Sequence, residues 1–264
     1  MKITIFTSNK FRHVSLINKI SSIASETYAI VETSIETKNS SSKSFTDTKE
    51  FKNYFSNVYN SEKRIFGENT QINKNVNLTT INFGNLSQLE KNNLNAALDA
   101  NYFIVFGASY IKGWLAEYLV EKKAINIHMG VSPYYRGTAC NFWALYDKNP
   151  QYVGSTIHLL SKGLDSGSIL YHALPLLRHD MNLFDFTMQS VNTAQLSLVN
   201  LICDGGIDKF TPVAQDKNLE IRYSRRDDFN CKSLQEYKNM KLEVKDIKKI
   251  LETEKPNLVR PIFI

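Results

Sequence analysis

The chain has 264 residues, of which 42% are hydrophobic and 22% are charged, and its net charge is +6. This composition excludes a disordered chain, because there is enough apolar material for a sizeable core. Three widely spaced cysteines, Cys140, Cys203 and Cys231, exclude a disulfide framework and a zinc ribbon and suit a reducing cytoplasm.

The isoelectric point near 9.0 suits an anionic partner such as a nucleotide, although a solvated surface explains it equally well. Charge alone does not favour a nucleic acid as partner. The first residues predict a short strand and not a signal peptide. The most apolar run, residues 102–111, is too short to cross a bilayer, which needs about 20 residues. We therefore expect a cytoplasmic protein with no membrane partner.

Strands and helices are predicted to alternate along the first half of the chain. Apolar runs predict strands over residues 3–7, 28–32, 77–82 and 102–106, and helical spacing predicts helices around 14–20, 51–59, 86–98 and 114–120. Residues 34–49, rich in Ser, Thr and Lys, predict a long exposed loop. A short strand over 124–127 follows. This pattern predicts a doubly wound, mostly parallel α/β sheet.

The pattern changes after residue 152. Two strands are predicted over residues 153–160 and 168–174, with a tight glycine-rich loop between them and a helix from about 182 to 203 after them. The remainder contains a basic turn at 222–226 and two predicted helices. We expect a catalytic domain over residues 1–205 and a small C-terminal extension over 206–264, which is a candidate element for homodimer formation.

Polar side chains stand at the ends of the predicted central strands. Asn126 and His128 lie at the carboxyl end of the strand over 124–127, and Asp165 lies in the loop between Gly163 and Gly167. Doubly wound enzymes keep their chemistry at this edge of the sheet. Because strand side chains alternate with period two, Asn126 and His128 are expected on the same side. Taken singly, each of these residues is better explained by a turn or a core position.

Taken together, the motifs resemble an active-site signature. Asn126-Ile127-His128, Pro133, Arg136-Gly137, Thr156-Ile157-His158 and Gly163-Leu164-Asp165-Ser166-Gly167 resemble, in that order, the signature of the 10-formyltetrahydrofolate-dependent formyltransferases. The resemblance is strong over residues 100–175 and weak at the first strand and its turn. It implies a Rossmann-like formyltransferase fold and transfer of a formyl group from 10-formyltetrahydrofolate, as co-substrate, to an amine. It also implies catalytic roles for Asn126, His128 and Asp165.

Formyl transfer passes through a tetrahedral intermediate, which needs a donor at the oxyanion, a proton carrier and a water-poor site. Asn126 and a protonated His128 are suited to donate to the oxyanion, and Asp165 to stabilise the imidazolium and relay protons through water. Cys140 lies near the signature, but nothing in the sequence marks it as a nucleophile. We interpret His158 as a supporting group outside the catalytic set.

The resemblance also implies where folate and the acceptor bind. The pterin ring is expected near residues 109–111 and the loop that begins at residue 160, and residues 130–133 match the stretch implicated in folate binding, although many relatives have Ser-Leu-Leu-Pro there. The expected cofactor contacts are Ser109, Tyr110, Ile111, Gly130, Val131, Ser132, Pro133, Leu160 and Gly163.

For the acceptor, the turn after the first strand and one arginine are the candidates. Ser8, Asn9 and Lys10 lie where doubly wound folds bind phosphate at a helix N-terminus, although ordinary helix capping explains them as well. Arg136 is a candidate substrate contact or the partner of a neighbouring carboxylate. We expect His172 and His179 at the surface. No set of His, Cys and Asp has zinc spacing, so no metal is predicted.

The proportions of the chain bear on the amine that is formylated. Family members that formylate initiator tRNA carry a further C-terminal domain for which too little chain is left, and the chain exceeds the minimal glycinamide ribonucleotide enzyme. Its proportions, with residues 8–13 and 223–230, look most like the sugar-nucleotide N-formyltransferases. The alternatives are formylation of methionyl-tRNA or glycinamide ribonucleotide, hydrolysis of the donor, or a catalytically inactive folate or nucleotide binder.

Overall fold

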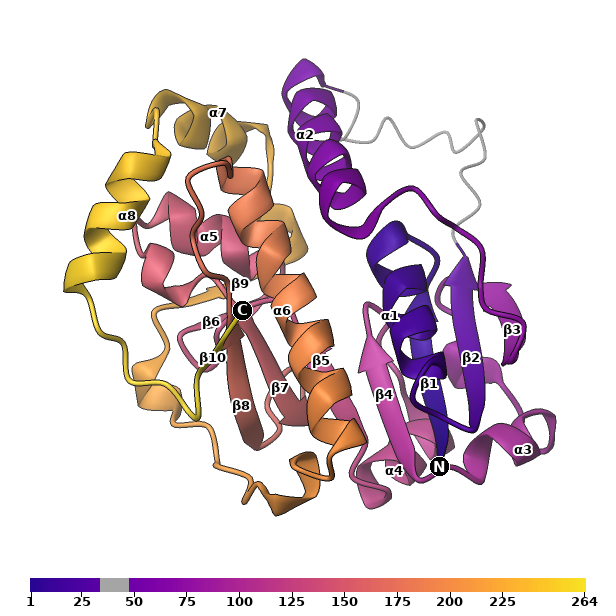
Figure 1. Ribbon diagram of the computed structural model, residues 1–264. Coiled ribbons are helices and arrows are strands. Elements are labelled where there is room, and N and C mark those ends of the chain that lie inside the picture. Colours follow the sequence, from indigo (N-terminus) through magenta and orange to yellow (C-terminus); the bar gives the residue numbers. More distant parts are fainter. Residues whose placement is uncertain (34–47) are drawn as a thin grey trace.

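An eight-stranded sheet forms the centre of the molecule, and the computed structural model describes residues 1–33 and 48–264 around it. The strand order is β10-β8-β7-β5-β4-β1-β2-β3, and most neighbouring strands run parallel (Figure 1). Most of the loop predicted over 34–49 lies outside the described residues. The predicted α/β fold with a mostly parallel, doubly wound sheet is confirmed.

The parallel part of the sheet contains the apolar segments predicted from the sequence. Its strands are β1 (Lys2–Ser8), β2 (Glu26–Thr33), β3 (Val76–Asn82), β4 (Tyr102–Phe106) and β5 (Ile125–His128). The central strands of this part are buried on both faces, which explains their continuous apolar runs.

Strand direction changes beyond β5. Strand β7 (Ser155–Leu159) runs antiparallel to β5, β8 (Ile169–Leu174) runs antiparallel to β7, and β10 (Ile262–Phe263) lies parallel to β8. The hairpin of β7 and β8 contains the tight glycine-rich loop that the sequence predicted. The loop leaves β7 beside the first residue of β5, Ile125, and folds back so that Asp165 lies next to His128 at the end of β5.

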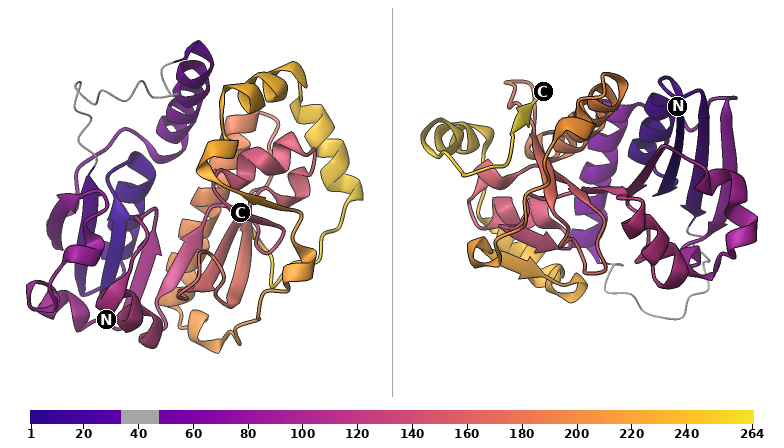
Figure 2. Two further views of the ribbon diagram at one scale, coloured as in Figure 1. Left: turned by 180° about the vertical axis from the view of Figure 1, so that it is seen from behind. Right: turned by 90° about the horizontal axis from the view of Figure 1, so that it is seen from below.

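Helices cover both faces of the sheet (Figure 2). Helices α1 (Phe11–Ser21) and α6 (Leu183–Cys203) pack on one face in a single apolar cluster with β1, and α2 (Lys49–Phe66) lies against α6. On the other face, α4 (Gly113–Glu121) packs against β1 and β4. This coverage is what a doubly wound sheet requires.

The prediction of one helix over residues 86–98 is wrong. The segment forms two short 3-10 turns, Leu86–Gln88 and Lys91–Leu94, before the four-residue helix α3 (Asn95–Leu98). The backbone is extended at Leu89 and Glu90, which breaks the helix although the apolar spacing is helical. Leu86, Leu94 and Leu98 are nevertheless buried in the cluster that contains α4.

The last third of the chain folds back against the segment that follows β5. Strand β9 (Arg222–Ser224) pairs in parallel with β6 (Tyr135–Gly137), and α5 (Cys140–Tyr146), α7 (Cys231–Asn239) and α8 (Val244–Thr253) enclose a further apolar cluster. Strands β6, β9 and β10 were not predicted from the sequence. Short 3-10 turns also occur at Pro150–Tyr152, Ile207–Lys209, Lys217–Leu219 and Arg226–Asp228.

Candidate active site

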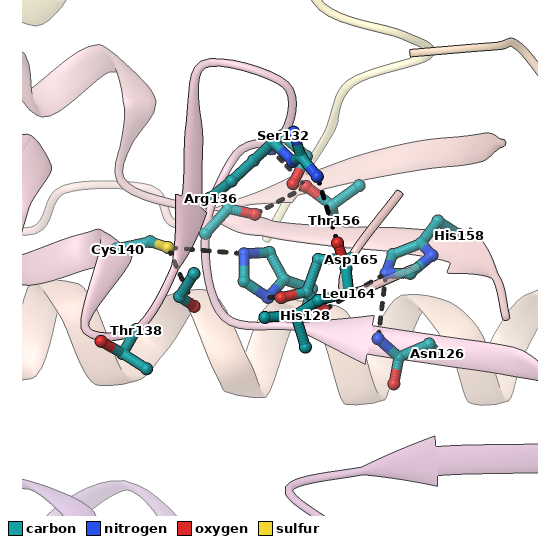
Figure 3. Close-up of polar contacts among 12 residues, drawn as sticks. Asn126, His128, Ser132, Arg136, Thr138, Cys140, Thr156, His158, Leu164 and Asp165 are labelled. Atoms are coloured by element: carbon teal, nitrogen blue, oxygen red, sulfur yellow. Dashed lines mark hydrogen bonds and ion pairs between the residues drawn. The ribbon is translucent and has the colours of Figure 1, made fainter. Parts of the chain in front are cut away.

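Strand β5 delivers the first two predicted catalytic side chains. Asn126 and His128 alternate with the buried Ile127, as the strand period of two requires. His128 is 8% exposed, while Asn126 is half-buried and lines a cavity. Figure 3 shows the imidazole of His128 between Asp165 and Cys140.

The third predicted catalytic residue meets His128 from the loop between β7 and β8. The Oδ2 atom of Asp165 lies 3.3 Å from the Nδ1 atom of His128. Asp165 has φ of +46°, in the left-handed region, which Asp and Asn tolerate better than most side chains do. The structure thus brings Asp165 to His128 across the end of the antiparallel pair β5–β7.

His158 ties Asn126 to this arrangement. It lies opposite Asn126 in the antiparallel register of β5 and β7, and its Nε2 accepts a hydrogen bond from the Asn126 amide at 2.9 Å. Its Nδ1 donates to the carbonyl of Leu159 at 2.8 Å, which fixes the tautomer. Burial lowers the pKa of His158 to about 4, so this ring is neutral at physiological pH. It also lies 3.9 Å from Asp165.

Cys140 contacts the other side of the His128 ring. Its Sγ atom lies 3.5 Å from Nε2 of His128, a long contact of the weak kind that sulfur makes. The side chain is 1% exposed, and burial raises the pKa of its thiol. A buried thiol of this kind is a poor nucleophile. Cys140 is therefore not a candidate nucleophile, and the amide, the imidazole and the carboxylate stay the predicted catalytic groups.

A cavity of about 130 Å³ opens beside these groups. One end is polar, with Asn126, His158 and Asp165, and the walls are largely apolar, with Val105 and Leu160 among them. Five of the predicted cofactor contacts line it, and they come from the loop after β4 and from the β7–β8 loop. They are Ser109, Tyr110, Ile111, Leu160 and Gly163.

The other predicted cofactor contacts lie apart from this cavity. Gly130, Val131, Ser132 and Pro133 are buried. The Thr156 hydroxyl donates to the carbonyl of Gly130 at 2.6 Å and accepts from the N–H of Ser132 at 2.8 Å. This stretch is thus held against β7, and its role in folate binding stays a prediction.

His172 is not at the surface, contrary to the prediction. It is 1% exposed, its Nε2 donates to the carbonyl of Ser132 at 2.8 Å, and its Nδ1 accepts from the N–H of Val259 at 3.0 Å. The prediction failed because β10 and the segment before it cover β8, a pairing that the sequence did not indicate. His179 is exposed, as predicted.

The predicted acceptor residues at the first turn lie at the same edge of the sheet. Ser8 ends β1, and Lys10 is the N-cap of α1, so neither Ser8 nor Asn9 holds the capping position. The carboxylate of Glu62 accepts the backbone N–H of Arg12 at 3.0 Å and pairs with its guanidinium at 2.9 Å. Part of this helix N-terminus therefore already has an anionic partner.

Arg136 stands on β6 near the β7–β8 loop. Its guanidinium pairs with Glu220 at 3.0 Å and donates to the carbonyl of Leu164 at 3.1 Å. Pairing with a neighbouring carboxylate, the alternative that the sequence left open, is thus present. The contact with Leu164 places Arg136 at the loop that carries Asp165.

Sequence reasoning missed two polar side chains at this edge. The carboxylate of Glu32, at the end of β2, accepts from the N–H and the hydroxyl of Ser109. The amide of Gln215 donates to the carbonyls of Asp165 and Gly167. No local pattern marks either residue, because their partners lie 48 to 77 positions away along the chain.

Within residues 1–33 and 48–264, no group of three or more His, Cys, Asp or Glu side chains is arranged to hold a metal ion. No helix in the same ranges has the length and apolar character needed to cross a membrane.

Comparison with a family model gives a match over more than half of the chain. The model described as formyl transferase matches residues 58–193, which include Asn126, His128 and Asp165. A curated relative, the mitochondrial formyltetrahydrofolate deformylase 1 of Arabidopsis thaliana, is 28% identical over 103 residues. That segment covers 39% of this chain and 30% of the relative, so the chain spans less than a third of the curated relatives that it matches.

Solved structures share the fold at low sequence identity. A 4-N formyltransferase from Francisella tularensis is 19% identical with a TM-score of 0.51, covering 100% of this chain and 92% of that one. An N-formyltransferase from Helicobacter canadensis, in complex with folinic acid and dTDP-3-aminofucose, is 15% identical with a TM-score of 0.51. It covers 90% of this chain and 79% of that one.

Proposed function

The chain belongs to the formyl transferase family, and from this membership we propose that it moves the formyl group of 10-formyltetrahydrofolate to the amine of a nucleotide-linked amino sugar. The observation that carries the proposal is the pairing of His128 with Asp165 at 3.3 Å, next to Asn126 and inside the segment that the family model matches.

The cavity beside Asn126 suits a planar heteroaromatic ring such as a pterin. Its apolar walls suit the ring faces, and the polar groups at one end suit the hydrogen-bonding edge of such a ring. Ser109, Tyr110, Ile111, Leu160 and Gly163 would hold the folate there. The bound donor would supply the formyl carbon that the amine attacks. The bond between this carbon and N10 of the folate would then break, and tetrahydrofolate would leave with a proton on N10.

Each of the three proposed catalytic side chains has a separate role. One N–H of the Asn126 amide is held by the neutral His158, which leaves the second N–H to donate to the developing oxyanion. His128, when protonated, adds a charge-assisted hydrogen bond, and Asp165 stabilises its imidazolium. Asp165 is also placed to take up the proton that the attacking amine releases, through water.

The proposal of an amino-sugar acceptor is supported by the solved relatives that share the fold. The solved relatives that share the fold include a 4-N formyltransferase and an enzyme in complex with dTDP-3-aminofucose. A phosphoribosylglycinamide formyltransferase from Anaplasma phagocytophilum shares the fold as well, with a TM-score of 0.50, so the fold alone does not separate the acceptors.

The same proposal covers the organisation of the chain. We propose that residues 1–205 form the catalytic domain, that 206–264 form an extension which could support a homodimer, and that the protein acts in the cytoplasm. The wide spacing of the three cysteines along the sequence supports the last point.

A panel of acceptors tests the function directly. Purified protein with 10-formyltetrahydrofolate is expected to formylate nucleotide-linked 3- or 4-amino-6-deoxy sugars, with the product measured by mass spectrometry. Glycinamide ribonucleotide and methionyl-tRNA complete the panel. Turnover of methionyl-tRNA alone, or release of formate without any acceptor, would contradict the sugar proposal. No turnover at all, with folate still bound, would identify an inactive binder.

Replacing His128 with Ala tests the mechanism. We expect the turnover number to fall by about 10²- to 10⁴-fold, because the proton carrier and one oxyanion donor are lost together. The control is the same substitution at the exposed His179, which should leave turnover unchanged. Full activity in His128→Ala would disprove the mechanism.

A further inference from the structure

Residues 213–220, which belong to the C-terminal extension, lie against the loop that carries Asp165. Val213 exchanges two backbone hydrogen bonds with Ile169, at 2.7 and 2.8 Å. Two residues later, the Nε2 atom of Gln215 donates to the carbonyls of Asp165 and Gly167, both at 2.8 Å. One side-chain amide therefore holds the backbone on both sides of Ser166.

The loop needs such support because its conformation is strained. Asp165 has a positive φ of 46°, which a non-glycine residue keeps only when its surroundings determine it. At Gly167 the loop lies so close to β7 that a Cβ atom would come within 1.7 Å of the Leu159 carbonyl. The contact with Gln215 acts on the carbonyl of the strained residue itself.

A second anchor from the same segment acts on the neighbouring residue. Glu220 pairs with Arg136 at 3.0 Å, and Arg136 donates to the carbonyl of Leu164 at 3.1 Å. The carbonyls of Leu164, Asp165 and Gly167 are thus held by side chains that belong to the extension or are paired with it.

We propose that Gln215 is a positioning residue that holds the carboxylate of Asp165 against His128, so that residues 213–220 are part of the catalytic site. This inference rests on the proposed function, since it assigns Gln215 a role through Asp165. Gln215 itself touches only the backbone of the loop.

Substitutions at Gln215 separate positioning from mere stability. In Gln215→Ala we expect the turnover number to fall by about 10- to 100-fold with KM values little changed, because a small misplacement of a catalytic group costs this much. Gln215→Glu is expected to lose more, because a carboxylate of the same size repels both carbonyls. The control is Gln235→Glu on α7, where the side chain is exposed and contacts only Asn239.

A double-mutant cycle tests whether the effect passes through Asp165. In an Asp165→Asn background, Gln215→Ala should change the residual rate by no more than about twofold. An equal loss in both backgrounds would overturn the proposal, because Gln215 would then act independently of Asp165. Wild-type turnover in Gln215→Ala would overturn it as well.

Hydrogen–deuterium exchange tests whether Gln215 holds the loop in place, without any assay of activity. Exchange of the peptide over residues 161–170 should rise in Gln215→Ala and stay at the wild-type level in Gln235→Ala. Unchanged exchange in Gln215→Ala would overturn the proposal that Gln215 holds the loop. If the wild-type protein shows no formyl transfer, the proposed function fails, while the exchange result still decides whether Gln215 holds this loop.

Discussion

At the residue scale, the site contains two imidazoles in different environments. His158 is fully buried and neutral, with both ring nitrogens engaged by Asn126 and Leu159. His128 lies between a carboxylate at 3.3 Å and a sulfur atom at 3.5 Å, so it has a partner suited to its protonated form. The first ring orients an amide, and the second is the one placed to move a proton.

Gly130 gives a prediction at this scale. A Cβ atom there would lie 2.4 Å from Cys140 Cβ and 2.9 Å from His128 Nε2. We expect Gly130→Ala to displace His128 and lower turnover by about 10- to 100-fold, with a stability loss of about 1–3 kcal/mol from overpacking. Steady-state kinetics and urea unfolding measure the two effects. A further Cys140→Gly substitution removes most of the clash and should restore part of the rate, whereas wild-type kinetics in Gly130→Ala would show that the ring has room to spare.

The sequence predicted the grouping of the candidate catalytic residues better than it predicted the residues around them. The strand period placed Asn126 and His128 together, and the resemblance added Asp165. The contact between Asn126 and His158 depends on the register of β5 and β7, which no local pattern specifies. His172 was misplaced for a similar reason, since its burial depends on a strand that arrives from residues 262–263.

At the scale of elements, the carboxylate of Glu32 joins three segments at the catalytic edge. It is fully buried at the end of β2 and accepts three hydrogen bonds, from Gly84 after β3 and from the N–H and hydroxyl of Ser109 after β4. Because Ser109 lines the cavity, this carboxylate helps to set the shape of the proposed folate site.

Replacing Glu32 tests this role. Glu32→Ala leaves buried donors without their acceptor, so we expect the free energy of unfolding to fall by about 2–4 kcal/mol. Glu32→Gln should lose less, since one acceptor oxygen remains. Urea titrations measure both variants. Glu26→Gln, at the half-buried start of the same strand, is the matched control and should change little. Equal stabilities for wild type and Glu32→Ala would mean that water satisfies the donors.

Long apolar elements were predictable, and short ones were not. The continuous apolar run of β4 predicts a strand by itself, because a strand buried on both faces is apolar throughout. Strands β6, β9 and β10 have two or three residues each and exist only through pairing with distant partners. Between Leu86 and Leu98, the apolar spacing predicted correctly which residues are buried. It did not predict the secondary structure, because Leu89 and Glu90 adopt an extended backbone that interrupts the helix.

At the scale of the whole molecule, three buried histidines make stability depend on pH. Burial lowers the pKa of His158 and His172 to about 4, and that of His13 well below its usual 6.5. In the unfolded chain these groups take up protons near pH 6.5, while the folded protein binds them only near pH 4 or below. Between these values the unfolded state binds more protons, so stability falls as pH falls.

We therefore expect the free energy of unfolding to decrease between pH 6.5 and 4, by roughly 2–3 kcal/mol for each of His158 and His172, with His13 acting in the same direction. Urea titrations at several pH values measure it. His172→Gln removes one of the three groups, so its profile should be flatter than that of the wild type even though the variant starts from a lower stability. If the stability profiles of His172→Gln and the wild type run parallel, the lowered pKa of His172 is contradicted.

The position of Gln215 has a consequence for the order of events during synthesis. Asp165 leaves the ribosome 50 residues before Gln215 does. At about 5–20 residues per second this delay lasts several seconds. During that time the nascent chain already contains Asn126, His128 and Asp165 but lacks the segment that holds the aspartate in place. The growing polypeptide thus gains its chemistry late, after most of the sheet has been translated.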